Sequence, residues 1–271
     1  MIRTVIVGAS GRMGRQMLRL LPQFPALTLV GAVASERSAA LGQSIQQHAG
    51  AIVISALLPP LLESADLVID FSSAAAAAAN VAACVGARVP LLLGTTGLAP
   101  ALAAPLAAAA QRIPLLVAPN TSPGVTLLLE LVRQSAQALP AGYDIEIVET
   151  HHRDKRDAPS GTALALGEAA AQGRGTTLAG QAVYGWQGQP NGDSRGEVRA
   201  PGQIGFSSLR GGDVVGEHEI CFLGDGEQLL LKHVATDRAV FARGALLAGQ
   251  WLAAQPAGRY GMRDVFMSKY K

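Results

Sequence analysis

Short apolar runs alternate with helix-length segments over the first 117 residues of the chain. The runs that read as buried strands are Thr4–Val7, Leu27–Val33, Leu67–Phe71, Leu91–Leu93 and Leu115–Val117. The intervening segments include Arg12–Leu21, Ala74–Val85 and Ala99–Gln111. The last two are rich in alanine, which is the strongest helix former. Strands and helices in this order predict βαβ units, and therefore a Rossmann-like, doubly wound parallel sheet with helices on both faces.

The pattern changes after about residue 122. A helix is expected from Val125 to about Leu139, followed by strand-like segments at "YDIEIVETHH", "IGFSSLR", "EHEICFL" and "QLLLKHVA". Asp225-Gly226 lies between the last two and is a hairpin signal. These features predict a smaller α+β domain with a mixed or antiparallel sheet, over residues 123–234. The segment 235–271, helical over Arg238–Gln255, is expected to rejoin the first domain (1–122), and Gly185–Asp193 is expected to be a mobile loop.

Composition and charge exclude several classes of protein. The 271 residues are 49% hydrophobic and 15% charged, with a net charge of +2 and no clustered basic field, so we expect no nucleic-acid or anionic-membrane partner. Residues 89–111 carry no charge, but glycine and proline break them into strand, loop and helix rather than a membrane span. Gly8 interrupts the N-terminal apolar stretch too early for a signal peptide. Cys84 and Cys221 lack metal-ligand spacing, so a reduced, soluble, cytoplasmic protein is expected.

The stretch "VIVGASGRMG" places glycines at positions 8, 11 and 14, directly after a strand and at the start of a helix. Small residues there allow backbone N–H groups to approach a pyrophosphate, which the helix dipole also attracts. The spacing is G-x-x-G-x-x-G rather than the usual G-x-G-x-x-G, and an ordinary glycine-rich turn is the alternative. The predicted cofactor residues of this turn are Gly8, Ala9, Ser10, Gly11, Arg12 and Met13.

Three further segments at strand ends are candidates for the same cofactor site. In "VASER", Glu36 could hold the ribose hydroxyls and Arg37 a 2′-phosphate, so NADH and NADPH are both expected to bind; two solvated loop charges are the alternative. "LGTTG" and "APNTSPG" also follow strands, and open α/β sheets bind ligands at the ends of their strands. Either segment alone could instead be an ordinary turn. With the glycine motif they favour a nicotinamide site, formed by Gly94, Thr95, Thr96, Ala118, Pro119, Asn120 and Thr121.

The stretch "HHRDKRDAPSGTA", His151–Ala163, concentrates titratable groups in a chain that otherwise has few. Ser160 can cap a helix that starts at Gly161, and the exposed N–H groups of such a start suit a carboxylate. Arg153, Lys155 and Arg156 would strengthen the attraction for an acidic substrate, and the histidines offer a proton donor near neutrality. A solvated loop is one alternative. A zinc site is another, but adjacent histidines with no nearby cysteine have poor ligand spacing, so no metal is expected.

Four motifs together, "GASGRMG", "GTTG", "ETHHRDKRDAPSGTA" and "GEHEICF", resemble the 4-hydroxy-tetrahydrodipicolinate (dihydrodipicolinate) reductase family of bacterial lysine and diaminopimelate biosynthesis. The resemblance implies nicotinamide-dependent reduction of a small cyclic dicarboxylate by a homotetramer built on the C-terminal sheet. It implies that residues 1–122 bind the dinucleotide and 123–234 the substrate. It further implies that His151 is the general acid/base, that Lys155 is a proton donor, and that His152, Gly161 and Thr162 bind the substrate. Ser160 is added to the substrate-binding residues because the amides of Ser160–Thr162 are expected to hold a carboxylate. The acid that several members carry at the tip of the second strand falls on Ser35, one residue before Glu36.

Two other functions are compatible with a dinucleotide-binding first domain. One is a dehydrogenase of an open-chain amino acid, against which the spacing of the dicarboxylate loop argues. The other is a regulator that binds NAD(H) without turnover. Such a regulator needs an output surface, for example a basic recognition helix, and the sequence shows none.

Overall fold

The computed structural model describes residues 1–47, 50–186 and 198–267, so most of the loop predicted at Gly185–Asp193 lies outside the described residues. Internal contacts divide the chain into two compact units. Unit 1 comprises Met1–Pro123 and Arg238–Lys271, and unit 2 comprises Gly124–Asp237. The sequence had placed these divisions after residues 122 and 234.

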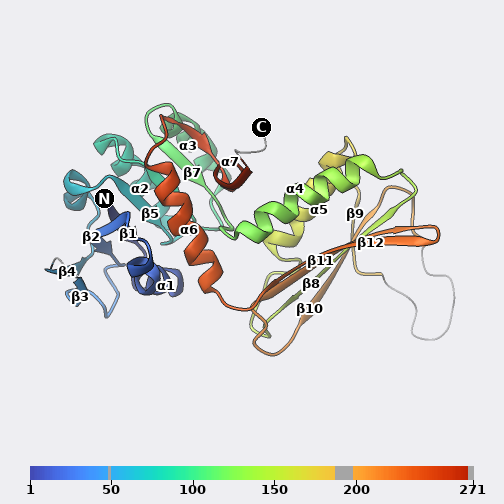
Figure 1. The fold of residues 1–271 in the computed structure, drawn as a ribbon, viewed down its shortest axis with the longest axis horizontal. Coiled ribbons are helices and arrows are strands. Elements are labelled where there is room, and N and C mark those ends of the chain that lie inside the picture. Colours follow the sequence, from blue (N-terminus) through green and yellow to red (C-terminus); the bar gives the residue numbers. More distant parts are fainter. Residues whose placement is uncertain (48–49, 187–197, 268–271) are drawn as a thin grey trace. The chain divides into compact units, whose positions relative to one another are not determined.

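Unit 1 is built on a sheet with helices beside it (Figure 1). The sheet has eight strands, in the order β13-β7-β6-β5-β1-β2-β4-β3. The predicted parallel strands are β1 (Ile2–Val7), β2 (Leu27–Val33), β5 (Leu67–Asp70), β6 (Leu91–Leu93) and β7 (Pro114–Val117). The short strands β3 (Ser44–Gln47), β4 (Gly50–Ser55) and β13 (Gly258–Tyr260) extend its edges and were not predicted. The chain runs from β1 to β2 on one side and later to β5 on the other, so the strand order reverses at β1. Open α/β sheets bind ligands at such a switch point, beyond the carboxyl ends of the strands.

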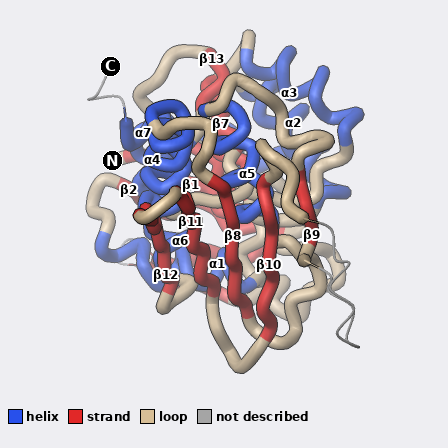
Figure 2. Tube along the Cα trace, turned by 90° about the vertical axis from the view of Figure 1, so that its right-hand side faces the viewer, coloured by secondary structure: helices blue, strands red, loops and turns tan. Residues whose placement is uncertain are grey.

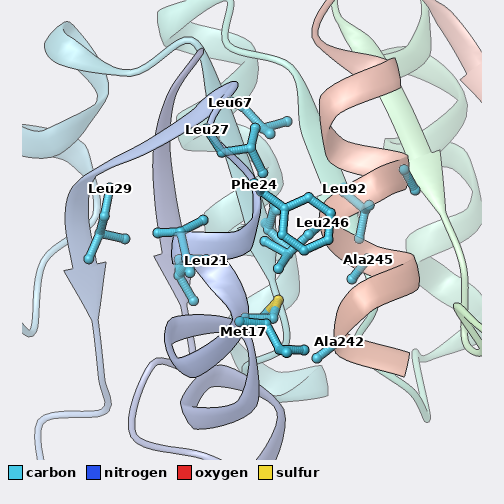
Figure 3. Packing of buried hydrophobic residues seen from close by; sticks show 14 of the residues in the cluster. Met17, Leu21, Phe24, Leu27, Leu29, Leu67, Leu92, Ala242, Ala245 and Leu246 are labelled. Atoms are coloured by element: carbon cyan, nitrogen blue, oxygen red, sulfur yellow. The ribbon is translucent and has the colours of Figure 1, made fainter. Parts of the chain in front are cut away.

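Helices cover both faces of this sheet, as predicted. Neighbouring residues of one strand contribute to opposite cores: Ile6 packs in one cluster and Val5 and Val7 in the other. The first cluster joins α1 (Arg12–Leu20) to α6 (Ala239–Leu252), so the C-terminal segment does pack on the first domain (Figure 3). The second cluster lies under α2 (Ala74–Ala87), α3 (Ala103–Ala110) and the 3-10 helix η2 (Pro59–Ser64).

Three short helices complete unit 1: η1 (Leu21–Gln23), η3 (Pro100–Leu102) and α7 (Met262–Met267). The helix predicted at Ala99–Gln111 is divided between η3 and α3. Across the described ranges, no helix is both long enough and apolar enough to cross a membrane.

Unit 2 has a five-stranded mixed sheet in the order β12-β11-β8-β10-β9, backed by two helices (Figure 2). The strands are β8 (Asp144–His151), β9 (Ala182–Tyr184), β10 (Ile204–Arg210), β11 (Gly216–Gly224) and β12 (Glu227–Ala235), and the helices are α4 (Pro123–Ala138) and α5 (Gly161–Gly173). Strands β8, β10 and β9 are parallel, whereas β11 runs antiparallel to both of its neighbours. The predicted turn joins β11 to β12, and Gly226 there has a φ of 84°.

The buried face of β8 changes character along its length. Ile145 and Ile147 pack in the core with residues of α4 and α5, whereas Glu149 and His151 follow on the same face, also buried. Because side chains alternate between the two faces of a strand, the residues that continue the hydrophobic stripe are a carboxylate and an imidazole. Buried ionisable groups need partners, so this end of the sheet is where a polar network is required.

Candidate active site

The glycine turn of unit 1 leaves no room for side chains. Gly8 has a φ of 80°, and a Cβ there would lie 2.7 Å from the carbonyl carbon of Phe71. A Cβ on Gly14 would lie 2.6 Å from the Cα of Ala9. Gly11 caps α1 without a side-chain hydrogen bond, so the N–H groups of the first turn have no intrahelical partner. This cradle, which any Cβ would fill, suits an approaching pyrophosphate.

The predicted Gly94–Thr96 segment lies beside this turn, at the carboxyl ends of β5 and β6. The Gly94 N–H donates to the carbonyl of Asp70 at 2.8 Å, and a Cβ on Gly94 would lie 2.6 Å from Cε2 of the Phe71 ring and closer still to two other ring atoms. The buried Thr95 hydroxyl lies 3.5 Å from the Asp70 carboxylate, whereas Thr96 is exposed. Phe71 therefore contacts both glycine segments, a role that the sequence did not reveal.

The predicted Ala118–Thr121 segment follows β7. Ala118 is buried and donates its N–H to the carbonyl of Leu93 at 3.0 Å, and Pro119 is exposed. The Asn120 side chain accepts from the N–H of Ser122 at 2.9 Å. The Thr121 hydroxyl is buried and donates to a carbonyl of α6 at 2.7 Å. Thr121 thus joins the segment to α6 rather than presenting its hydroxyl to solvent.

Glu36 and Arg37 are exposed and are the two central residues of a turn. The turn is closed by a hydrogen bond from the Ser38 N–H to the Ser35 carbonyl, at 2.9 Å. This turn follows β2, whose last carbonyl accepts from both Gly8 N–H and Ala9 N–H at 2.9 Å. The turn consequently starts next to the glycine cradle, where ribose and 2′-phosphate recognition would take place.

In unit 2, Glu149 is the centre of a network at the end of β8. Its Oε2 lies 2.5 Å from His151 Nδ1 and accepts from Arg210 Nη1 at 2.8 Å. Its Oε1 accepts from Arg210 Nη2 at 2.7 Å and from the Ser160 N–H at 3.1 Å. Glu149 is only 1% exposed. Burial raises the pKa of this carboxyl, but the hydrogen bonds from Arg210 and His151 outweigh it and hold the pKa at about 2.

His151 is buried beside this carboxylate, and the pKa of its imidazole is lowered. Burial is the main cause, Glu149 opposes it, and the positive charges of Lys155 and Arg210 reinforce it. The lowered pKa favours the neutral imidazole around pH 7. Since the ionised Glu149 can only accept, the proton of the neutral imidazole lies on Nδ1 and the lone pair on Nε2.

Ser160 is the N-cap of α5, as predicted: its Oγ accepts from the N–H of Ala163 at 3.1 Å. The same Oγ lies 2.9 Å from His218 Nε2, and Ser160 is 2% exposed. Burial and then the neighbouring His151 lower the pKa of His218 to about 4, and the two imidazoles meet edge to face. Both polar groups of Ser160 thus have partners within unit 2, whereas Gly161 is exposed and Thr162 half-buried at the start of α5.

The loop between β8 and α5 carries the predicted cations. Lys155 Nζ lies 2.8 and 2.7 Å from the two carboxylate oxygens of Asp157. The Lys155 N–H donates to the carbonyl of His152 at 3.1 Å, and His152 is half-buried. Arg153 and Arg156 are exposed. Lys155 is therefore held by a carboxylate of its own loop.

Sequence reasoning missed Glu149, Arg210, His218 and Asp157. Glu149 carried a signal, because it continues the alternation of Ile145 and Ile147 two positions before His151. His218 lies in the motif "GEHEICF", but nothing in the sequence connected it to Glu149 or Ser160, and Arg210 carried no signal. Strand pairing sets Arg210 opposite His151 and His218 opposite Glu149. Within the ranges that the structure describes, no group of three histidine, cysteine or acidic side chains could hold a metal ion.

Comparison with known proteins gives consistent matches along the chain. The family model described as "Dihydrodipicolinate reductase, N-terminus" matches residues 2–121, and "Dihydrodipicolinate reductase, C-terminus" matches residues 124–266. The chain is 46% identical over 269 residues to the 4-hydroxy-tetrahydrodipicolinate reductase of Anaeromyxobacter dehalogenans strain 2CP-1, covering 98% of this chain and 97% of the relative. It is 43% identical over 272 residues to that of Rubrobacter xylanophilus, covering 99% of each.

Among solved structures, a dipicolinate-bound dihydrodipicolinate reductase from Paenisporosarcina sp. TG-14 matches with a TM-score of 0.77 and 24% identity, covering 96% of this chain and 97% of that one. A myo-inositol dehydrogenase from Corynebacterium glutamicum matches with a TM-score of 0.61 and 13% identity, covering 98% and 93%. At these identities the structural matches show the fold alone, which is α/β with a Rossmann-like unit and a second mixed sheet.

Proposed function

The chain belongs to the dihydrodipicolinate reductase family, and on that premise we propose that it reduces 4-hydroxy-tetrahydrodipicolinate to tetrahydrodipicolinate with NADH or NADPH. The observation that carries the proposal is the end of β8. The buried His151, whose pKa is lowered, is the last residue of this strand, and Lys155 lies in the loop that leads from it to the start of α5. A proton-transferring group and a carboxylate-binding helix start on one loop suit a small acidic substrate whose reduction takes up a proton.

The nucleotide would bind unit 1 and supply the hydride. The cradle formed by Gly8, Gly11 and Gly14 fits its pyrophosphate, and the first-turn N–H groups of α1 would donate to it. Glu36 and Arg37, both exposed, would read the adenosine ribose, one as a hydroxyl acceptor and the other as a phosphate partner. Both forms of the nucleotide are therefore expected to serve.

The dicarboxylate would bind at the start of α5 and along the preceding loop. Gly161 and Thr162 occupy the first turn of a thirteen-residue helix, so their N–H groups and the helix dipole favour one carboxylate. Lys155 and His152 would bind the other, which requires Lys155 to exchange Asp157 for the substrate. Ser160 would act through its cap and its N–H bond to Glu149 rather than by direct contact.

Proton transfer is assigned to His151, with Lys155 as a second donor. The lowered pKa of His151 favours the neutral imidazole near pH 7, with its proton on Nδ1, so its Nε2 can take a proton from solvent and deliver it to the substrate. Lys155 has the charge to stabilise negative charge that develops on the substrate.

The test is loss of the reduced-nicotinamide absorbance on mixing the purified full chain with nucleotide and 4-hydroxy-tetrahydrodipicolinate. We expect turnover with the cyclic substrate and none with open-chain amino acids. We expect His151→Gln to lower kcat by roughly 10²–10⁴-fold while nucleotide affinity persists. Nucleotide binding without turnover would favour an NAD(H)-sensing protein, and turnover of an amino acid would favour the rival dehydrogenase.

We further propose a homotetramer assembled through the open face of the unit 2 sheet. The helices cover one face, and the other carries exposed apolar side chains: Leu209 (55% exposed), Leu230 (51%) and Val234 (47%). Strand register puts these side chains on the side away from the helices. Light scattering should give four chains, and Leu230→Glu should give smaller species, because a charge would then be buried in the interface.

The reaction would contribute to diaminopimelate and lysine biosynthesis, as the names of the relatives suggest. We infer a cytoplasmic location, where thiols stay reduced. Cys84 and Cys221 are both free in the structure, which is consistent with that environment.

A further inference from the structure

The Glu149 carboxylate lies between His151 on one side and Arg210 on the other, inside the unit 2 network. We propose that Glu149 and Arg210 are a positioning pair: they fix the His151 imidazole with its Nδ1–H on Glu149 and leave Nε2 as the atom for proton transfer. The proposal rests on the proposed function, because it assigns supporting residues to the same reaction. Neither residue needs to touch the substrate.

The hydrogen bonds around Glu149 prevent it from turning. Each carboxylate oxygen has at least two partners, namely His151 Nδ1 and Arg210 Nη1 on Oε2, and Arg210 Nη2 and the Ser160 N–H on Oε1. The Ser208 side chain also hydrogen-bonds to this carboxylate. An ionised carboxylate accepts about four hydrogen bonds, so this one is saturated. Because Glu149 is only 1% exposed and all its acceptor positions are used, its carboxylate is held in one orientation. The groups that donate to it, including the His151 ring, are held in place by the same hydrogen bonds. His151 therefore inherits a single ring position and a single tautomer.

Arg210 gives the pair a second property, which is near-neutral charge. A lone buried carboxylate next to His151 would stabilise the imidazolium and raise the pKa of His151. The bidentate guanidinium offsets that charge, and the pKa of His151 is in fact lowered, with burial as the main cause. Glu149 can thus orient the imidazole without keeping it permanently protonated, as a group that cycles between acid and base requires.

The surroundings of Nε2 are consistent with this assignment. Within the described part of the chain, Nε2 has no hydrogen-bond partner. Strand β11 passes this edge of the ring at Gly216, where an added Cβ would lie 3.0 Å from Nε2. A glycine there leaves the ring edge less crowded than any other residue would.

Arg210 also connects the pair to the substrate loop. Its Nη2 donates to the carbonyl of Asp157 at 2.6 Å and its Nε to the carbonyl of Lys155 at 3.3 Å. One guanidinium therefore orders both the proton-transfer residue and the backbone that carries Lys155. A change at Arg210 should affect the substrate KM as well as kcat, whereas a change at Glu149 should affect mainly kcat.

The central test compares Glu149→Gln with Asp66→Asn in the full-length protein. Asp66 forms a bidentate pair with Arg3 in unit 1, so it controls for loss of a carboxylate–arginine pair that is not part of the unit 2 network. We expect Glu149→Gln to lower kcat by roughly 10²–10⁴-fold, with a KM change of only a few-fold, because the amide can present N–H to Nδ1 and reverse the tautomer. Glu149→Asp should recover part of the loss, and Asp66→Asn should retain wild-type kcat. A Glu149→Gln variant that folds and keeps wild-type kcat would overturn the proposal.

Nitrogen NMR of histidine-labelled protein tests the pair without any turnover. We expect a neutral His151 with its proton on Nδ1 in the wild type and loss of that signature in Glu149→Gln. A wild-type His151 protonated on Nε2 alone would contradict the positioning role. Because this measurement needs no substrate, a correct tautomer in an inactive protein would refute the proposed function and leave the positioning pair standing.

Arg210→Met tests the charge balance through the pH dependence of the reaction, which would not change if Arg210 had only a structural role. We expect the apparent pKa of His151, read from kcat/KM against pH and from NMR titration, to rise once the carboxylate is no longer offset. An unchanged or lower pKa in a folded variant would refute the charge-balancing part of the proposal. Should Arg210→Met fail to fold, Arg210→Lys keeps one charge but loses the bidentate geometry, and it should raise KM and lower kcat together.

Discussion

Replacing Asp157 by asparagine should strengthen binding of a flat dicarboxylate such as pyridine-2,6-dicarboxylate. Both carboxylate oxygens of Asp157 contact Lys155 Nζ, at 2.8 and 2.7 Å. A ligand carboxylate that binds Lys155 must first displace this internal competitor. Asp157→Asn removes the competing charge while keeping the size and shape of the side chain.

The size of the effect follows from the exposure of the pair. The Lys155 side chain is 20% exposed and that of Asp157 is 61% exposed, so solvent screens the pair, and such pairs contribute about 0.2–1 kcal/mol. Since about 1.4 kcal/mol is a factor of ten, Asp157→Asn should tighten binding by roughly 1.4- to 5-fold. Lys155→Met loses a charge-assisted hydrogen bond worth about 1.5–3 kcal/mol but no longer has to break the pair. The net loss of about 0.5–2.8 kcal/mol should weaken binding by roughly 2- to 100-fold.

The assay is calorimetric titration of the nucleotide-bound protein with pyridine-2,6-dicarboxylate, repeated as inhibition kinetics against the cyclic substrate. A double-mutant cycle gives the decisive comparison: Asp157→Asn should have no effect on affinity when Lys155 is already methionine. Added salt should weaken wild-type binding and reduce the differences between variants, because exposed charges are screened. The reasoning is refuted if Asp157→Asn weakens binding, if the same tightening persists without Lys155, or if the inhibitor competes with NADH instead of the substrate.

Three further predictions concern the nucleotide cradle and acid stability. Gly14→Ala should cost about 1–3 kcal/mol of unfolding free energy and weaken nucleotide binding, because its Cβ would lie 2.6 Å from the Cα of Ala9. Gly86→Ala, with open space around its Cβ, should lower neither stability in calorimetry nor affinity in NADH titration. Arg37→Ala should lower kcat/KM for NADPH more than for NADH, and equal losses would remove Arg37 from 2′-phosphate recognition. Glu149 has a pKa of about 2 in the folded state against an ordinary 4.5, so its stabilisation is complete above about pH 4.5 and is lost as the pH falls towards 2. Urea unfolding across that range should therefore show a steeper acid loss, by up to about 3 kcal/mol, in the wild type than in Glu149→Gln.

Much of the fold could be predicted because the signals are local. The apolar runs of β1, β2 and β6 are buried on both faces, and a strand of that kind needs a continuous hydrophobic segment whatever its neighbours are. The Ser160 cap and the Asp225-Gly226 turn depend on residues within three positions of each other. The three-residue strand β13 was missed because its pairing with β7 comes from the packing of the C-terminal segment and not from its own composition.

The candidate site also has parts that local sequence signals predict and parts that only tertiary contacts create. The sequence by itself determined the glycine turn, the helix start at Gly161 and the cationic loop before it, since each is contiguous in the chain. Only the tertiary structure decided what these groups do: Arg210 reaches Glu149 from 61 residues away, and His218 reaches Ser160 from 58. Their meeting depends on the register of β10 and β11 against β8, and a shift of one residue would turn each of these side chains to the opposite face of the sheet. The protonation of His151 was likewise decided by the structure, because it depends on burial and on charges brought together by strand pairing rather than on the residues next to it in the chain.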